Sequence, residues 1–477
     1  MTVPVFVGID LGTSGVKVVA LGLDGTVHAE AAREYPVRSP APGQAETHPA
    51  DWWDAVVAAL GEALSSGRLE VAGIGVDGQM HGLVLADEDG SPIRPALLWA
   101  DSRATSEVSA WQALPDELLH KLANPLSPGM TGPLLLWVRR NEPAAYERAH
   151  IALLPKDWVR HRLTGDVATD PSDASATLLW DVPGDRWADD VVRGVGLDPG
   201  LLPPVRPSGE RAGVVSARGL PRVDVGVPVA TGCADTAAAL LATGLTDPLD
   251  PQISVGTGAQ IVRPVHDPVV TPDPRTHLYR SAAAEGARWY AMAAVQNAGL
   301  ALDWVRRVLG LGWDELYAAA ERPPGADGVT FVPYLTGERS PVLNAHARGA
   351  WLGLDLAGDR ASLAQAAVEG VAFAIRHALE ALPSASKLEH ARLVGGGIAA
   401  PAFRTLLADV LGMPLHPIGV RSASAVGAAM LAASAAGLPV PPPPVTADPV
   451  VHPTHRAKQY EPLYHRYRDH AEHIAAK

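Results

Sequence analysis

The sequence predicts an α/β protein built from two domains around a duplicated core. Its 477 residues exceed what one hydrophobic core usually serves, since domains typically hold roughly 100–200 residues. Strand and helix patterns are mixed along the chain, as in α/β architectures. Two strand–glycine turn–strand units open near residues 4 and 253, so the two halves begin alike, as duplicated domains would.

Composition limits the class of protein. The chain is 47% hydrophobic and 19% charged, which suits a folded enzyme. Its net charge of −13 and scattered basic residues disfavour nucleic acid or an anionic membrane surface as a partner. Its single cysteine, Cys233, cannot form an internal disulfide, and the apolar N-terminal run is interrupted by Asp10, unlike a signal peptide. No uncharged run of about 18 apolar residues occurs, so we expect a cytoplasmic protein without a membrane span.

The first domain is predicted to span residues 1–245. It opens with a β-meander of strands at 4–10, 16–23 and 26–37, the last two joined by an Asp-Gly turn. An amphipathic helix follows at 51–64 and a strand at 69–78. The domain is expected to end with a strand at 227–232 and a helix at 236–245, because the second hairpin begins just afterwards.

The second domain is predicted at 246–437, with strands at 253–256 and 259–265. Apolar spacing predicts long helices at 289–310, 362–382 and 402–412, and a strand at 391–397 precedes the last of them. The third segment, 438–477, combines an extended Pro-rich stretch at 438–453 with a polar C-terminal helix. Tyr460, Tyr464 and Tyr467 share one face of that helix, so we expect it to dock on the body.

Three glycine-rich turns have the features of a nucleotide site, because glycine lets backbone N–H groups approach an anion closely. Each turn alone also fits an ordinary glycine hairpin, but the three together favour phosphate binding. We therefore predict that ATP and Mg²⁺ are bound by Asp10 (the metal), Gly12, Thr13, Ser14 and Lys17, by Gly256, Thr257 and Gly258, and by Gly396 and Gly397.

Two other nucleotide-binding patterns fit poorly. No lysine stands in a GxxxxGK[ST] pattern, so a Walker P-loop is absent. The segment GIGVDG at 73–78 matches GxGxxG, but a strand and a turn follow it where a dinucleotide fold needs a helix. Phosphoryl transfer in this chain therefore requires another fold.

Polar residues next to strands are the candidate substrate site. Asp235 follows one strand and begins a helix, where it is either an N-cap or a rigidly placed catalytic base. His81, in GQMHG at 78–82, is either an exposed turn histidine or a ligand with room beside its glycines. Trp99, Asp101 and Arg103 form a third polar cluster, equally compatible with a helix cap and an ion pair.

The same motifs resemble the FGGY family of carbohydrate kinases over nearly the whole chain, and most closely its bacterial xylulokinases. The matching segments, in order, are GIDLGTSGVK (8–17), GQMHG (78–82), RPALLWADSRA (94–104), PGMTGPLLLW (128–137), LLPKDWVRHRLTGDVATDPSDAS (153–175), PYLTGERSP (333–341) and GAWLGL (349–354). The resemblance implies an actin-like, ribonuclease-H-like fold duplicated into two domains, with ATP on the second and the sugar in the cleft between them.

The resemblance also implies roles for individual residues. Asp10 would bind magnesium and the Gly12–Thr13 turn would bind phosphate, while Thr257 would bind the γ-phosphate. Gly396 and Gly397 would lie against the adenosine. Met80 and His81 would touch the sugar, and Asp235 would take its proton. The implied reaction is ATP-dependent phosphorylation of D-xylulose to D-xylulose 5-phosphate.

Departures from the family pattern leave the sugar open. Thr236 stands where an asparagine that contacts the sugar is usual, and Asp77 replaces a small residue, so both are counted among the substrate-binding candidates. Leu134 and Ser362 depart at positions expected to affect packing only. Kinases for ribulose, fuculose, erythritol or glycerol remain alternatives, as does a non-enzymatic actin-like ATPase, although that would have no use for GQMHG or ADTAA. A homodimer is compatible with the family, but no segment marks an interface.

Overall fold

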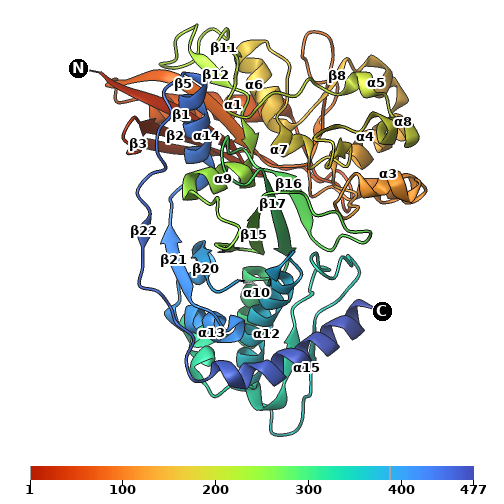
Figure 1. Ribbon diagram of the computed structural model, residues 1–477, viewed down its shortest axis with the longest axis vertical. Coiled ribbons are helices and arrows are strands. Elements are labelled where there is room, and N and C mark those ends of the chain that lie inside the picture. The colour runs from red at the N-terminus through yellow and green to blue at the C-terminus, as the bar shows by residue number, and fades with distance from the viewer. Residues whose placement is uncertain (1, 386–387, 477) are drawn as a thin grey trace.

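The computed structural model describes residues 2–385 and 388–476 as two α/β bodies, one above the other in Figure 1. The first body is built on a sheet of strand order β11-β12-β5-β1-β2-β3, with β13 paired to β5 beside β12. Its strands are β1 (Val3–Leu11), β2 (Gly15–Gly22), β3 (Val27–Glu34), β5 (Leu69–Gly78), β11 (Arg211–Val214), β12 (Pro228–Ala230) and β13 (Cys233–Ala234).

The second body is built on a sheet of order β16-β17-β15-β14-β20-β21-β22. Its strands are β14 (Gln252–Val255), β15 (Ala259–Val265), β16 (His277–Arg280), β17 (Trp289–Val295), β20 (Ala391–Val394), β21 (Leu415–Gly419) and β22 (Thr446–Ala447).

The two sheets share one topology. In the first, β3, β2 and β1 pair antiparallel, and β5 and then β12 continue parallel to β1. In the second, β17, β15 and β14 pair antiparallel, and β20 and then β21 continue parallel to β14. The duplicated core expected from the two hairpins is therefore confirmed.

The helices cover these sheets and fill the space outside them. Those of the first half are α1 (Pro49–Ala63), α2 (Val108–Gln112), α3 (Asp116–His120), α4 (Thr131–Asn141), α5 (Pro143–Arg148), α6 (Pro155–Thr164), α7 (Pro171–Ala174), α8 (Asp189–Gly194) and α9 (Asp235–Thr243). Those of the second half are α10 (Gly299–Leu309), α11 (Trp313–Ala318), α12 (Arg360–Glu380), α13 (Pro401–Leu411), α14 (Ala423–Ala435) and α15 (Ala457–Ala475). Within the described ranges, none is long and apolar enough to cross a membrane.

The helix expected at 289–310 is wrong in its first third. Residues Trp289–Val295 form the strand β17, and helix α10 begins only at Gly299. Every residue of β17 is buried, because the strand lies between β15 and β16 inside the sheet. A continuous apolar run of this kind has no polar face, and its periodicity cannot separate a central strand from a buried helix.

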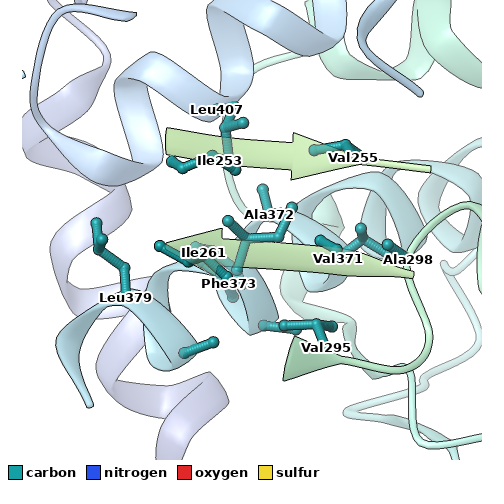
Figure 2. Close-up of a cluster of buried hydrophobic side chains, with 14 of the residues drawn as sticks. Ile253, Val255, Ile261, Val295, Ala298, Val371, Ala372, Phe373, Leu379 and Leu407 are labelled. Carbon is teal, nitrogen blue, oxygen red and sulfur yellow. The ribbon is translucent and has the colours of Figure 1, made fainter. Parts of the chain in front are cut away.

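The core of the second body lies between its sheet and helix α12. Figure 2 shows Ile253, Ile261 and Val295 of the sheet facing Val371 and Phe373 of the helix. The C-terminal helix α15 closes this core from outside, because its buried Tyr460, Tyr464 and Tyr467 have ring centroids 6.2, 6.0 and 5.5 Å from that of Phe373. The expected docking of this helix is confirmed. The predicted segment ends at Lys477, which lies outside the described residues.

Helix α14 returns to the first body, although it lies within residues 246–437. It crosses β1 and β5 at positions where these strands carry glycine. A Cβ built on Gly8 would lie 1.7 Å from the Ala425 carbonyl oxygen, and one on Gly75 would lie 2.0 Å from that of Ala428. After α14 the Pro-rich stretch runs in extended form down one side of the molecule to the second body (Figure 1).

This close approach gives a stability prediction. Gly8→Ala places a methyl group against helix backbone that can move only with the whole of α14, so we expect a loss of about 1–3 kcal/mol or more in the free energy of unfolding. Gly61→Ala, within helix α1, is the matched control, since the added Cβ would make an ordinary contact 3.4 Å from the Pro221 side chain. It should gain about 0.5–1 kcal/mol through helix propensity. Denaturant unfolding measures both, and equal effects would contradict the packing argument.

Candidate functional site

Acidic side chains gather where the parallel strands of the first sheet end. Asp10 on β1 is the register partner of Asp77 on β5, which in turn pairs with Cys233 on β13. Helix α9 begins at Asp235, two residues further along. The carboxyl ends of these strands therefore bring together residues that are more than 200 positions apart in the sequence.

Asp235 occupies the first turn of α9 without capping it, because Ala234 is the residue at the N-cap. Its Oδ1 accepts hydrogen bonds from the backbone N–H (2.5 Å) and hydroxyl (3.2 Å) of Thr236. Burial and the neighbouring charge of Asp10 raise the pKa of Asp235 to about 7. A carboxylate with a pKa near neutrality is suited to accept a proton.

Asp77 has no exposed surface and lies beside Asp10 in the register of two neighbouring strands, and the sugar contact expected of it stays a prediction. Burial and the nearby carboxylates of Asp10 and Asp235 raise the pKa of Asp77 well above its usual range. Neither of its oxygens has a hydrogen-bond partner in the part of the chain that the structure describes.

The first glycine turn joins β1 to β2 and is held on both sides. The Gly12 N–H donates to the Gly15 carbonyl at 3.0 Å, and the Gly12 carbonyl accepts from Gln79 Nε2 at 3.1 Å and from the Tyr35 hydroxyl. Ser14 at its tip is exposed, and Lys17 faces Asp10 across the β1–β2 pair. The turn thus presents backbone to the cleft in one fixed conformation.

The cluster of Trp99, Asp101 and Arg103 separates into two roles. Asp101 pairs with Arg103 at 2.8 Å and accepts from the backbone N–H of Ala45, so these two residues hold structure. Trp99 instead donates its indole N–H to the Thr13 hydroxyl at 2.9 Å. Trp99 therefore contacts the first glycine turn, which its sequence neighbourhood alone did not indicate.

The second and third turns border a cavity of about 1040 Å³ on the second body. Gly256, Thr257, Gly396 and Gly397 line one part of it, and Trp313 and Tyr317 line another, with ring centroids 5.6 Å apart. Gly258 lies beside these residues and must stay small, since a Cβ there would be 2.5 Å from the Val295 carbonyl oxygen. A cavity with glycine backbone at one end and aromatic rings at the other fits a nucleotide.

A second cavity of about 760 Å³ lies between the two bodies. Asp235 and Thr236 line it from α9, Gln252 and Gln260 line it from the second sheet, and Gly396 is shared with the first cavity. The segment after β20 therefore separates the aromatic cavity from the one that contains Asp235.

Met80 is buried and His81 is partly buried, so the exposed-turn alternative for His81 is wrong. His81 has a φ of 71°, and its Nδ1 lies 2.6 Å from the Ala176 carbonyl oxygen, to which it must donate. Burial lowers the pKa of His81 to about 4, so the ring is neutral at physiological pH. Its Nε2 is consequently an acceptor for a hydroxyl group.

Four residues of the second body form a cluster with His81 and Trp99, and none was predicted. His277 and Tyr279 come from β16, Tyr290 comes from β17, and Arg339 lies on the loop after strand β18 (Thr330–Val332). The Tyr279 ring lies 5.9 Å from that of His81, and the Arg339 guanidinium lies 5.0 Å from the Trp99 ring centroid. Only Arg339 carried a sequence signal, since it lies in the segment PYLTGERSP.

Comparisons with known proteins identify the family. The N-terminal domain model of the FGGY family of carbohydrate kinases matches residues 5–242, and the C-terminal domain model matches residues 252–436. The chain belongs to the FGGY family of carbohydrate kinases. It is 34% identical to a xylulose kinase of Escherichia coli over 90% of each chain, and 35% identical to one of Streptomyces coelicolor over 91% of this chain and 88% of that one.

Solved structures of FGGY kinases share the fold of this chain. A xylulose kinase of Rhodospirillum rubrum superposes with a TM-score of 0.88 at 28% identity, over 98% of this chain and 99% of that one. A glycerol kinase of Plasmodium falciparum gives 0.88 at 18% identity, over 99% and 98%, which concerns the fold alone. The two-domain fold implied by the resemblance is therefore confirmed. As a carbohydrate kinase, the protein transfers phosphate from a nucleotide to a sugar, and the non-enzymatic alternative is set aside.

The first glycine turn gives a binding prediction. Gly12→Val should abolish binding of MgATP while the protein still folds, because a branched side chain would stand between the phosphates and the backbone donors. Gly358→Val is the matched control, since it lies in an exposed loop where a Cβ would make an ordinary contact 3.4 Å from the Asp355 carbonyl oxygen, and it should leave affinity unchanged. Calorimetry with a non-hydrolysable ATP analogue measures both. Full affinity in Gly12→Val would place the phosphates elsewhere.

Proposed function

We propose that this FGGY kinase phosphorylates D-xylulose on its O5 hydroxyl, with Asp235 as general base. The observation that carries the proposal is the position of Asp235, which begins α9, lines the cavity between the bodies, and has a pKa raised to about 7. The names of its relatives support the choice of sugar, since the E. coli and Streptomyces coelicolor proteins are xylulose kinases.

The reaction follows from the groups in the cleft. Asp235 accepts the proton of the sugar hydroxyl while the oxygen of that hydroxyl bonds to the γ-phosphorus. The bond between the γ-phosphorus and the β–γ bridging oxygen breaks, and ADP leaves with the electron pair. The N–H groups of Gly12 and Gly256 are bonded within their own turns, to the carbonyls of Gly15 and Gly258, so Thr13 and Thr257 supply the donors to the phosphates. Gly396 and Gly397 lie along the adenosine. His81 Nε2 accepts from a second sugar hydroxyl and orients the acceptor.

The carboxylates fit a magnesium ion that arrives with the nucleotide. Within the described chain no three side chains of the usual ligand types form a metal site, but Mg²⁺ is commonly held by one or two carboxylates together with phosphate oxygens and water. The charge of Asp10 is close enough to raise the proton affinity of Asp235, which a cation would relieve. Asp10 would be the protein ligand, and the ion would neutralise phosphate charge.

Other acceptors remain a second candidate because of Thr236. Its hydroxyl is engaged with Asp235 at 3.2 Å, so it offers the sugar less than an asparagine amide would. Ribulose, fuculose, erythritol and glycerol therefore belong in the same assay as xylulose.

The base assignment predicts both a rate and a pH profile. Asp235→Asn should lose about 100-fold to 10,000-fold in turnover while nucleotide still binds. Because burial raises the pKa of Asp235, the group is protonated and inactive below about pH 7, so kcat/KM should fall as the pH drops through that value. A coupled ADP-release assay from pH 5 to pH 9 measures this. More than about a tenth of wild-type activity in Asp235→Asn would refute the assignment.

Thr236 predicts relaxed specificity. The loss of one hydrogen bond to a neutral partner is worth roughly 0.5–1.5 kcal/mol, about three- to tenfold in affinity. We expect D-xylulose to be phosphorylated with a weaker KM than is typical of xylulokinases, or a second ketose or polyol to be accepted comparably, and Thr236→Asn to shift preference toward xylulose. An ADP-release screen over pentuloses, hexuloses and polyols measures both proteins. No turnover of xylulose by either one would overturn the choice of sugar, though not the kinase class.

A further inference from the structure

The guanidinium group of Arg339 lies between the first glycine turn and the cluster of His81, His277 and Tyr279. It is 5.0 Å from the centroid of the Trp99 ring, whose indole N–H donates to Thr13. The charge of Arg339 acts on His81, His277 and Tyr279, so it lies beside side chains of both bodies.

This guanidinium has no anionic partner. Throughout residues 2–385 and 388–476, no carboxylate oxygen lies within 4.0 Å of its nitrogens, and its side chain makes no hydrogen bond. Two other arginines that lie over aromatic rings are paired, Arg103 with Asp101 and Arg280 with Asp185. A largely desolvated cation without a partner is costly, so its retention in a cleft points to a ligand.

The adjacent carboxylate is occupied by the backbone. Glu338 Oε1 accepts from the N–H groups of Gln296 (2.6 Å) and of Arg339 itself (2.8 Å). The loop is also held by Asn297, which donates to the Gly337 carbonyl at 2.6 Å, and by the Ser340 N–H, which donates to the Ala294 carbonyl at 3.0 Å. Glu338 therefore fixes the backbone of Arg339 and acts on its charge only from beyond ion-pair distance, so the guanidinium donors stay available, as expected of a preorganised binding group.

The surroundings favour the sugar as its ligand. The Tyr279 hydroxyl beside Arg339 is buried and has no partner in the described chain, and the Tyr279 ring lies 5.9 Å from that of His81. The first phosphate turn reaches Arg339 only through Trp99, whose indole N–H is already used by Thr13. A guanidinium offers donors only, so the atom opposite it must accept, and a carbonyl, carboxylate or phosphate oxygen does so without a proton of its own that would need a further partner.

A ketose that presents O5 for phosphorylation carries such an atom. A 2-ketopentose closes its ring through O5, so a free O5 hydroxyl implies an open chain with a free carbonyl at C2. The corresponding polyol has a hydroxyl group at C2. Water, or a side chain that both donates and accepts hydrogen bonds, can bind that hydroxyl group equally well.

We propose that Arg339 donates hydrogen bonds to the C2 carbonyl oxygen of the acceptor and thereby selects ketoses over polyols. This inference rests on the proposed function, because it takes the acceptor to be a pentulose. Arg339 is then a specificity residue supplied by the nucleotide-binding half of the chain, so the sugar pocket is complete only when both bodies contribute to it.

The test measures binding of D-xylulose and D-arabinitol by calorimetry without nucleotide, in the wild type and in Arg339→Met, Arg339→Gln and Arg339→Lys. A lost hydrogen bond to a charged donor should weaken xylulose binding roughly tenfold to 100-fold in the Met and Gln variants and leave arabinitol within about threefold. Arg339→Lys should recover part of the loss. Arg162→Met is the matched control, since Arg162 lies 5.3 Å from the Trp53 ring centroid on exposed surface and should change neither affinity.

Three results would overturn the inference. Equal losses for both ligands would make Arg339 a packing residue. Unchanged sugar affinity with lower kcat and weaker nucleotide binding would assign it to the phosphoryl group. No binding of xylulose by the wild type, with no turnover of any pentulose, would remove the proposed function and this inference together. Circular dichroism melts establish that each variant is folded, and the three substitutions ensure that one misfolded variant does not decide the result.

Discussion

The gathering of carboxyl groups at the ends of β1, β5 and β13 is the constraint on which the site depends. Parallel strands bring Asp10, Asp77 and the start of α9 to one edge, where burial opposes their ionisation. The pKa of Asp77 is raised well above its usual range, and that of Asp235 is raised to about 7. Burial, and after it the charge of Asp10, thus gives Asp235 the proton affinity on which the proposed base role depends.

A buried ionic network holds this edge in place. Lys156 Nζ lies 2.6, 3.1 and 3.3 Å from Asp157, Asp170 and Asp173, all of them inaccessible to solvent. Asp170 accepts from the Ser172 hydroxyl at 2.6 Å, and that hydroxyl accepts from the Ala234 N–H at 3.0 Å, one residue before Asp235. Removing one partner from such a network leaves a buried charge uncompensated. The network therefore specifies where strand β13 ends.

The two bodies are joined at the sugar side of the cleft. The Asn124 side chain both donates to and accepts from the backbone of Leu278, and Ser175 accepts from the Arg280 N–H at 2.9 Å, so edge strand β16 is fixed to the first body, as its position in Figure 1 also shows. Tyr279 and His277 reach the pocket through this junction. On the other side, where α9 and α14 face β20 and β21, the cavity that contains Asp235 stays open. Rigid contact on one side and space on the other suit a cleft that closes about β16.

The sequence by itself determined the paired hairpins, the glycine turns and the start of α9, because each depends on local chemistry: alternating apolar residues, glycine at a turn, and an acid before an alanine-rich helix. It failed at 289–295, where burial on both faces removes the polar side from the pattern. Tertiary structure alone decided that Asp77 lies buried beside Asp10 and that Trp99 faces Thr13 while Asp101 does not. It also decided that Tyr279 lies next to His81, and Arg339 next to Trp99. These relations join positions far apart in the chain, and neither periodicity nor spacing carries information about which distant surfaces will meet.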